Sequence, residues 1–139
     1  MIDQEEIRTQ CLSNDPEERL KVLDQLRLNF LLFPNKQQAW NDLIRLTIDQ
    51  DSSVRRSAAK SLYSVFPHVP DKEKAWEDLH RLTNDKDRDM RMGAIVVFIS
   101  SFSQLPNRQQ AWNDLHRLLS DEDVNVRMGA IAALRHSFF

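Results

Sequence analysis

Apolar and polar positions alternate with the period of an α-helix along most of the chain. In residues 39–46 an Ala, a Trp and two Leu fall at i, i+1, i+4 and i+7, which is one face at 3.6 residues per turn. Close copies of this stretch occupy residues 75–82 and 111–118. Tryptophan stands at positions 40, 76 and 112, so the spacing is 36 residues both times. A fixed period of about 20 to 50 residues is typical of stacked repeat proteins, and the pattern therefore predicts an all-α solenoid.

Each repeat is expected to contain two helices joined by an acidic turn. The first helix begins after a proline, with Asn35, Asp71 or Asn107 as the capping residue. The second helix follows the turn and has an apolar residue at every fourth position. These residues are Val54, Ala58, Leu62 and Phe66 in one copy, Met90, Ala94, Phe98 and Phe102 in the next, and Val126, Ala130, Leu134 and Phe138 in the last. Neither helix can bury its apolar stripe alone, so we expect four stacked pairs in a right-handed α-solenoid.

The repeat divides residues 1–139 into one domain of four units, at about 1–33, 34–69, 70–105 and 106–139. The first unit is diverged: its first helix lacks a Trp and contains Asp3, Glu5, Glu6 and Arg8. Terminal repeats of solenoids turn a polar face to water, so this unit is expected to be an N-terminal cap. The last unit ends in apolar residues without a polar cap. We expect its end face either to continue in a longer parent or to pair with another copy or partner.

An arginine interrupts the apolar face of each second helix. Arg55, Arg91 and Arg127 occupy this position, and Arg19 matches them in the first unit. A guanidinium group directed at a core is costly unless it is paired and hydrogen-bonded. We therefore predict a structural ladder in which each arginine binds turn carboxylates of its own or the adjacent repeat. The candidate acids are Asp49, Asp51, Asp85, Asp87, Asp121 and Asp123.

The first helices contain a second set of charges. Asp42, Asp78 and Asp114 precede Arg45, Arg81 and Arg117 by three residues and are expected on the solvent side. Such pairs stabilise a helix by only ~0.2–0.5 kcal/mol each. His80 and His116 lie at equivalent positions one repeat apart, and no Cys or third His accompanies them, so we predict no metal site. The two glycines, Gly93 and Gly129, also occupy equivalent positions inside second helices, where we expect a close helix approach.

The segments DQDSSVRRSAAKSL (residues 49–62) and DEDVNVRMGAIAAL (residues 121–134) resemble HEAT repeats. They are most similar to the subclass named after phycobilisome lyases, with its acidic turn, Val-Arg and Ala-rich helix. The resemblance implies a curved stack whose second helices line the concave side. It is unspecific for function, because such repeats serve as scaffolds, regulators and enzyme parts. The period of 36 is longer than is usual for that subclass, with the additional residues in the proline-containing connections.

The outward positions of the second helices differ between repeats. They are Arg56 and Lys60 in the second unit, Met92 and Val96 in the third, and Met128 and Ala132 in the fourth. This face changes from basic to apolar along the stack, and the methionines and valine suit a partner helix or peptide. The alternative is that neighbouring helices simply cover these residues.

Composition excludes several classes of function. With 19 basic and 21 acidic residues the net charge is −2, which opposes nucleic-acid binding. A single cysteine, Cys11, excludes an internal disulfide, and no apolar run is long enough to span a membrane. We therefore expect a soluble, cytoplasmic protein.

The sequence predicts a non-catalytic scaffold or adaptor that binds another protein or peptide. It contains no recognisable catalytic set, phosphate-binding loop or metal spacing, so we assign no catalytic residue and no cofactor. One alternative is an enzyme subunit of the bilin lyase or isomerase type, which the resemblance suggests. Another is a DNA-binding HEAT-like protein, for which Arg55, Arg56 and Lys60 would have to form a basic groove.

Overall fold

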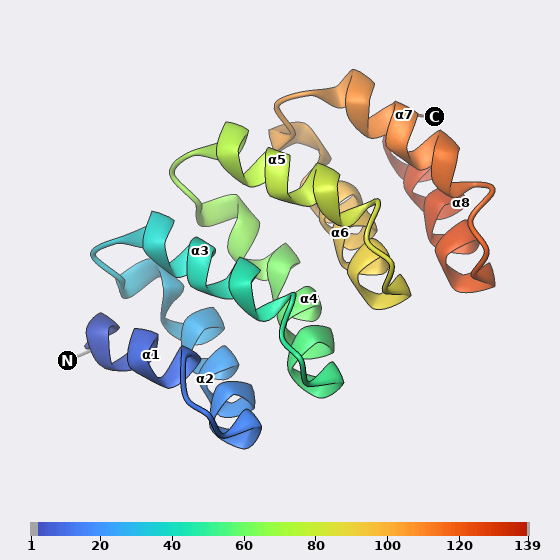
Figure 1. The fold of residues 1–139 in the computed structure, drawn as a ribbon. Coiled ribbons are helices and arrows are strands. Elements are labelled where there is room, and N and C mark those ends of the chain that lie inside the picture. Colours follow the sequence, from blue (N-terminus) through green and yellow to red (C-terminus); the bar gives the residue numbers. More distant parts are fainter. Residues whose placement is uncertain (1–2, 139) are drawn as a thin grey trace. The chain divides into compact units, whose positions relative to one another are not determined.

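The computed structural model describes residues 3–138, with Phe138 described by its backbone alone (Figure 1). Within this range the chain is all-helical, without a strand, as the hydrophobic period predicts. The elements are α1 (Gln4–Cys11), α2 (Pro16–Asn29), η1 (Phe30–Leu32), α3 (Lys36–Leu46), α4 (Ser52–Val65), η2 (Phe66–His68), α5 (Lys72–Leu82), α6 (Arg88–Ser100), η3 (Phe102–Gln104), α7 (Arg108–Leu118) and α8 (Val124–Phe138). The three η elements are single turns of 3-10 helix.

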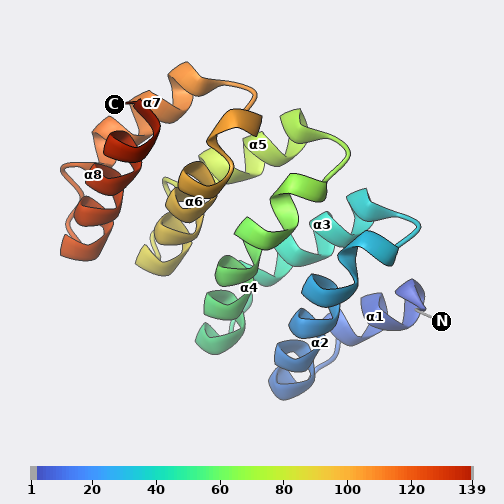
Figure 2. The same ribbon diagram turned by 180° about the vertical axis from the view of Figure 1, so that it is seen from behind.

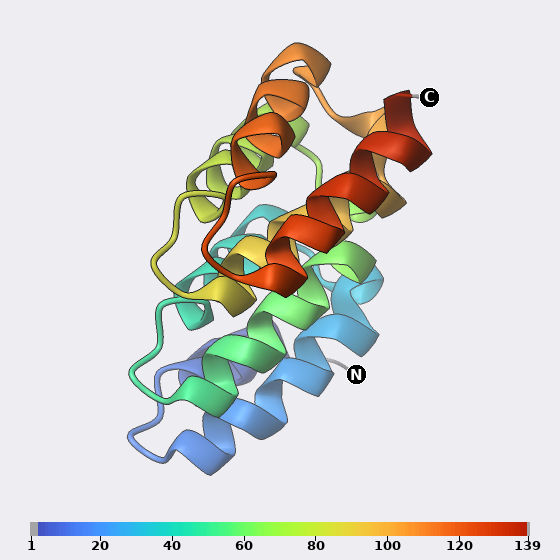
Figure 3. The same cartoon turned by 90° about the vertical axis from the view of Figure 1, so that its right-hand side faces the viewer.

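The helices form two compact units, residues 1–71 and 72–139, and each unit contains two of the predicted helix pairs. In the first unit α1 packs against α2 and α3, and α2 lies side by side with α4 (Figure 2). In the second unit α5 packs on α6, α7 packs on α8, and α6 packs on α8. Figure 3 shows this second unit from the side of α8, drawn in red.

Side-chain caps start α3 and α7 at the predicted residues, Asn35 and Asn107. The Asn35 carboxamide oxygen accepts a hydrogen bond from the Gln38 backbone N–H, and Asn107 does the same for Gln110, at 3.0 and 2.9 Å. Asp15 caps α2, with Pro16 at the first helical position. The connections to the next repeat end on a buried apolar residue just before each proline: Phe33, Val69 and Leu105.

The tryptophans anchor the cores of both units. Trp40 is fully buried and meets the Phe66 ring edge-on at 6.2 Å between centroids. Trp76 is buried and stacks on Phe98 at 5.3 Å. Trp112 is half-buried, with the His116 ring 3.8 Å from it. The indoles therefore belong to the packed face of the first helices, and the predicted apolar stripe is confirmed. The Phe138 side chain, predicted in the last stripe, lies outside the described residues.

Gly129 marks the close approach that its place inside a helix predicts. A Cβ atom at this position would lie 3.1 Å from both Sδ and Cε of Met92, and 3.5 Å from Cγ2 of Ile95. The Met92 thioether of α6 therefore packs directly on the α8 backbone. Gly93, the equivalent residue in α6, is buried.

The first-helix aspartates lie differently from the prediction. Asp42 and Asp114 were expected on the solvent side, but they are 3% and 2% exposed, while Asp78 is partly exposed. The reason is that α1 and the end of α5 each contribute a basic side chain, Arg8 and His80, that reaches the carboxylate from the preceding pair. An aspartate that the single-helix pattern assigns to the surface is thus covered by its neighbour.

Candidate partner-binding surface

In the first unit, one arginine connects two consecutive helix pairs. Arg19 of α2 donates from Nε to Oδ2 of Asp49 and from Nη2 to Oδ1 of the same carboxylate, at 2.7 and 2.9 Å. Its third nitrogen, Nη1, donates to the backbone carbonyl of Ser13 at 2.7 Å. Asp49 lies in the turn after α3, so this two-pronged ion pair joins the first helix pair to the turn of the second.

The second unit has a corresponding ion pair, in which Nη2 of the arginine donates a hydrogen bond to the carboxylate and Nε lies close to it without a hydrogen bond. The guanidinium group of Arg91 lies against Asp121, with Nε 2.9 Å from Oδ1 and Nη2 donating to Oδ2 at 3.0 Å. Nη1 donates to the carbonyls of Asp85 and Lys86, at 2.8 and 3.0 Å. The two charged side chains are only 8% and 10% exposed. Charge-assisted, paired contacts of this kind offset the desolvation of both groups.

The turn before each arginine also offers it backbone carbonyls, which were not among the predicted partners. Nη1 of Arg55 donates to the carbonyls of Asp49 and Gln50, and Nη1 of Arg127 donates to those of Asp121 and Glu122. The prediction considered only carboxylates of the turn. Side-chain spacing alone does not show where the carbonyls of a turn point.

The two aspartates of each acidic turn have different roles. The first of them accepts a hydrogen bond from the backbone N–H two residues later, at Asp49, Asp85 and Asp121. The second caps the following helix, at Asp51, Asp87 and Asp123. Asp123 also accepts from Nη1 of Arg88 at 3.0 Å, an exposed pair. The predicted ladder residues thus lie at the turns. Their spacing in the sequence does not show that the two aspartates of each turn have different roles.

The electrostatics of Asp49 agree with its role as an acceptor. Burial acts to raise the pKa of this carboxyl, but hydrogen bonds from Arg19 and the Asp51 N–H outweigh it, so the net pKa is lowered. The bond to Asp49 in turn raises the pKa of Arg19. Both groups are therefore charged at neutral pH.

A second polar cluster, absent from the prediction, surrounds Asp114 in the second unit. Oδ2 of Asp114 lies 2.7 Å from Nδ1 of His80, and Oδ1 accepts from Gln110 and Arg117 at 3.1 and 3.3 Å. Arg117 also donates to Oγ1 of Thr83 at 2.8 Å. An Asp at the same position of every full repeat was the available signal, and it was assigned to weak surface pairs instead.

The equivalent site in the first unit is less complete. Asp42 accepts from Gln38 at 3.1 Å, Nε of Arg8 stays 3.7 Å away, and Oδ2 of Asp42 is buried without a hydrogen bond. Burial accordingly raises the pKa of Asp42. Cys11 is buried beside it, and burial, followed by the Asp42 charge, raises the pKa of its thiol to about 12. Cys11 is therefore a core residue in its thiol form.

The predicted partner-binding residues occupy the outward sides of the second helices. In the first unit, Arg56 and Lys60 are exposed one turn apart on α4. In the second unit, Val96 of α6 is 36% exposed, Met128 of α8 is 62% exposed, and Ala132 is exposed. Met92 is only partly exposed because its thioether lies on Gly129. The alternative that neighbouring helices cover this face therefore applies to Met92, part of which α8 covers. The other residues reach solvent.

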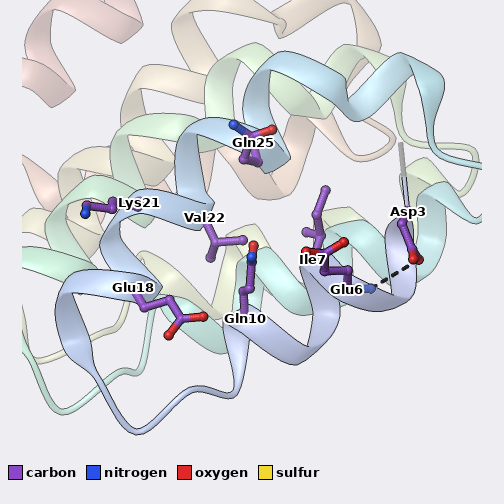
Figure 4. A pocket seen from close by; sticks show the side chains of 8 residues that line it. All are labelled: Asp3, Glu6, Ile7, Gln10, Glu18, Lys21, Val22 and Gln25. Carbon is purple, nitrogen blue, oxygen red and sulfur yellow. Dashed lines mark hydrogen bonds between the residues drawn. The ribbon is translucent and has the colours of Figure 1, made fainter. Parts of the chain in front are cut away.

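A hollow of about 370 Å³ lies between α1 and α2 (Figure 4). Gln10 and Val22 point toward each other across it, and its rim contains three carboxylates and one lysine. The lining residues are Asp3, Glu6, Ile7, Gln10, Glu18, Lys21, Val22 and Gln25. Asp3 is already engaged as the cap of α1, accepting from the Glu6 N–H at 3.2 Å. This polar face agrees with the character expected of a terminal cap.

Among residues 3–138, no group of three or more His, Cys, Asp or Glu side chains is placed to hold a metal ion. In the same range, none of the helices combines the length and the apolar character needed to cross a bilayer.

Comparison with known protein families and with curated proteins finds no match to this chain. Among solved structures, the chain is similar to the crystal structure of an engineered protein, a target of the Northeast Structural Genomics Consortium. The TM-score is 0.65 at 20% sequence identity, over 98% of this chain. The chain spans 62% of the length of that engineered protein. At this identity the likeness concerns the fold alone.

Proposed function

We propose that the four helix pairs stack as a right-handed α-solenoid of HEAT-like repeats. The support is the recurrence of one connection in both units: Arg19 with Asp49 and Arg91 with Asp121, each pair thirty residues apart in the sequence. The same arginine position also recurs as Arg55 and Arg127. A contact that joins each pair to the next is what a nearest-neighbour stack requires.

We propose further that the protein is a non-catalytic interaction scaffold, with the outward sides of the second helices as its binding surface. The observation behind this proposal is a contrast between two sets of positions. The connecting arginine recurs in all four units and the paired turn aspartates recur in the three full repeats. The residue after each arginine differs instead: Leu20, Arg56 and Met128 are exposed, and Met92 is partly exposed. Residues that connect the helix pairs recur between repeats. Exposed residues that vary between repeats can determine which partner binds.

Partner capture with matched variants tests this proposal. The chain and two variants are immobilised and exposed to extract from the source cell. One variant changes the second helices (Lys60→Glu, Val96→Ser, Met128→Ser), and the other changes exposed first-helix positions (Glu77→Ala, Asn113→Ala). We expect one protein to be retained by the chain and by the first-helix variant, and lost from the second-helix variant. Equal retention by all three would contradict the proposal.

Self-association is a second candidate, because one apolar face of α8 reaches solvent. Ile95 of α6 is fully buried against α8, but Ile131, its equivalent in α8, is 46% exposed, beside the exposed Val124 and Met128. The face that α6 buries in the second unit is therefore open on α8. We expect sedimentation equilibrium to detect a dimer that Ile131→Ser weakens, whereas a concentration-independent monomer would exclude it.

A further inference from the structure

Three of the five exposed leucines in the first helix pair lie together where α2 ends. Leu28, Leu31 and Leu32, at the end of α2 and in η1, are 67%, 61% and 68% exposed. Their spacing of i, i+3 and i+4 places them on one side of a helical turn. Single exposed apolar residues need no explanation, but a contiguous group of large ones marks an interaction site.

The fold does not require leucine at these positions. The same positions of the later repeats are Ser64, Pro67 and His68, and Ser100, Ser103 and Gln104. None of these six residues is buried. A repeat can therefore form with polar residues there, and the leucine cluster, defined as Leu28, Leu31 and Leu32, serves something other than packing.

The neighbouring helix supplies positive charge. Helix α4 lies beside α2 and runs in the same direction (Figure 2). Its sequence contains Arg55, Arg56 and Lys60 and no acidic residue, and Arg56 and Lys60 are exposed. Tyr63 on the same helix is 48% exposed, at the position that Arg27 occupies on α2. Neighbouring helices lie ~8–10 Å apart, so one ligand helix can span the leucines, Tyr63 and these cations.

We propose that this surface of the first unit binds an acidic amphipathic helix, with apolar anchors on the leucine cluster and Tyr63 and carboxylates facing Lys60 and Arg56. This inference rests on the proposed scaffold function and names the chemistry of the partner. Helix α2 has three exposed acids. Asp24 accepts a hydrogen bond from Arg27 at 3.2 Å, and Glu17 and Glu18 lie in the first turn of the helix, at the opposite end from the leucine cluster. Charge complementarity therefore favours an anionic partner, and the apolar anchors favour a helix presenting residues at i, i+3, i+4 and i+7.

The test titrates the full chain into a fluorescent peptide of about 18 residues, five turns of helix. The peptide has Leu at i, i+3, i+4 and i+7 and Glu elsewhere, and a second peptide has Lys in place of every Glu. We expect the Glu peptide to bind at least about tenfold more tightly than the Lys peptide. We also expect its affinity to fall as salt is raised, because exposed charges are screened.

Two variants identify the surface. Leu28→Ser with Leu31→Ser introduces at residue 28 the serine found at residues 64 and 100, so the fold should persist, and it should weaken the Glu peptide at least about tenfold. Lys60→Glu should weaken it several-fold and remove most of the salt dependence. The matched controls are Ile48→Asn, which alters a 71% exposed residue at the end of α3, and Lys86→Glu, which alters an exposed cation of the second unit. Both controls should bind as the unchanged chain does.

Amide chemical-shift mapping of the unchanged chain gives a readout independent of any variant. The Glu peptide should perturb residues 20–32 and 56–64 most strongly. Absent binding, a preference for the Lys peptide, or shifts centred on α6 and α8 would overturn the inference. The inference would also be overturned if phosphatidylserine vesicles or duplex DNA bound equally well and competed with the peptide. A natural partner lost on Val96→Ser and Met128→Ser alone would leave the scaffold proposal standing and refute only this surface.

Discussion

At the scale of the residue, the arginine inside each apolar face is explained by the groups that surround it. Arg91 meets one carboxylate of the next turn and two carbonyls of its own turn, so most of its donors are satisfied in a nearly buried site. Position alone predicted that an acid must be near, because an unpaired guanidinium group in a core is costly. The carbonyl acceptors and the choice of Asp121 over the cap Asp87 depend on the turn conformation, which side-chain spacing does not encode.

A double-mutant cycle on Arg91 and Asp121 measures this connection. Removing either partner leaves a buried charge, so Arg91→Ala or Asp121→Ala should lower the free energy of unfolding by about 3–5 kcal/mol. The two changes together should cost much less than their sum, as measured by urea denaturation. The pair Arg88 and Asp123, whose arginine is 64% exposed, is the control and should couple much more weakly, because solvent screens exposed ion pairs. Additive effects at Arg91 and Asp121 would contradict the role assigned to them.

The buried aspartates provide a matched comparison between equivalent positions. Asp114 has three side-chain donors, so Asp114→Asn should lower the free energy of unfolding by about 1–3 kcal/mol. Asp42 has one donor and a raised pKa, so Asp42→Asn should raise stability at pH 7. The folded state binds the Asp42 proton more tightly than the unfolded state, so its penalty is present at neutral pH and disappears as the pH falls through the folded pKa. The gain should therefore shrink toward pH 4; a loss of stability at pH 7 would show that Asp42 is adequately paired.

At the scale of the element, helix number, order and starts followed from the sequence with few errors. The 36-residue period located each pair, and Asn35 and Asn107 marked starts that the structure confirms. The burial of Asp42 and Asp114 was missed for a physical reason. A helical wheel describes one helix against one neighbour, and here Arg8 and His80 from the preceding pair cover a flank that the wheel assigns to water.

Gly129 tests how closely α6 and α8 pack. An alanine would gain about 0.5–1 kcal/mol of helix propensity, but its Cβ would press on the Met92 thioether at 3.1 Å. Because that side chain is flexible, Gly129→Ala should change stability by less than about 1 kcal/mol. Gly129→Leu cannot be accommodated in this way and should cost about 1–3 kcal/mol. Thermal unfolding of both variants checks this, and a tolerated leucine would mean that the two helices are not in contact here.

At the scale of the whole molecule, the sequence predicted an all-α protein, and the structure and the similar engineered protein agree on that class. The binding surface was only partly predictable. The outward positions of Arg56, Lys60, Val96 and Met128 led to their being proposed as partner-binding residues. The leucine cluster was not predicted, because a helical pattern does not separate exposed leucines from core leucines. The sequence already shows that Ser64 and Ser100 occupy the positions equivalent to Leu28. The exposed surface of Leu28 in the structure then shows that this leucine is not a core residue.

The central claim is that partners bind the outward sides of the second helices. Amide hydrogen exchange of the chain, free and saturated with its captured partner, tests it most directly, because protection is resolved along every helix. The account predicts new protection concentrated in α2, α4, α6 or α8, with α1, α3, α5 and α7 unchanged. Protection confined to the first helices, with the second helices exchanging as in the free chain, would contradict it.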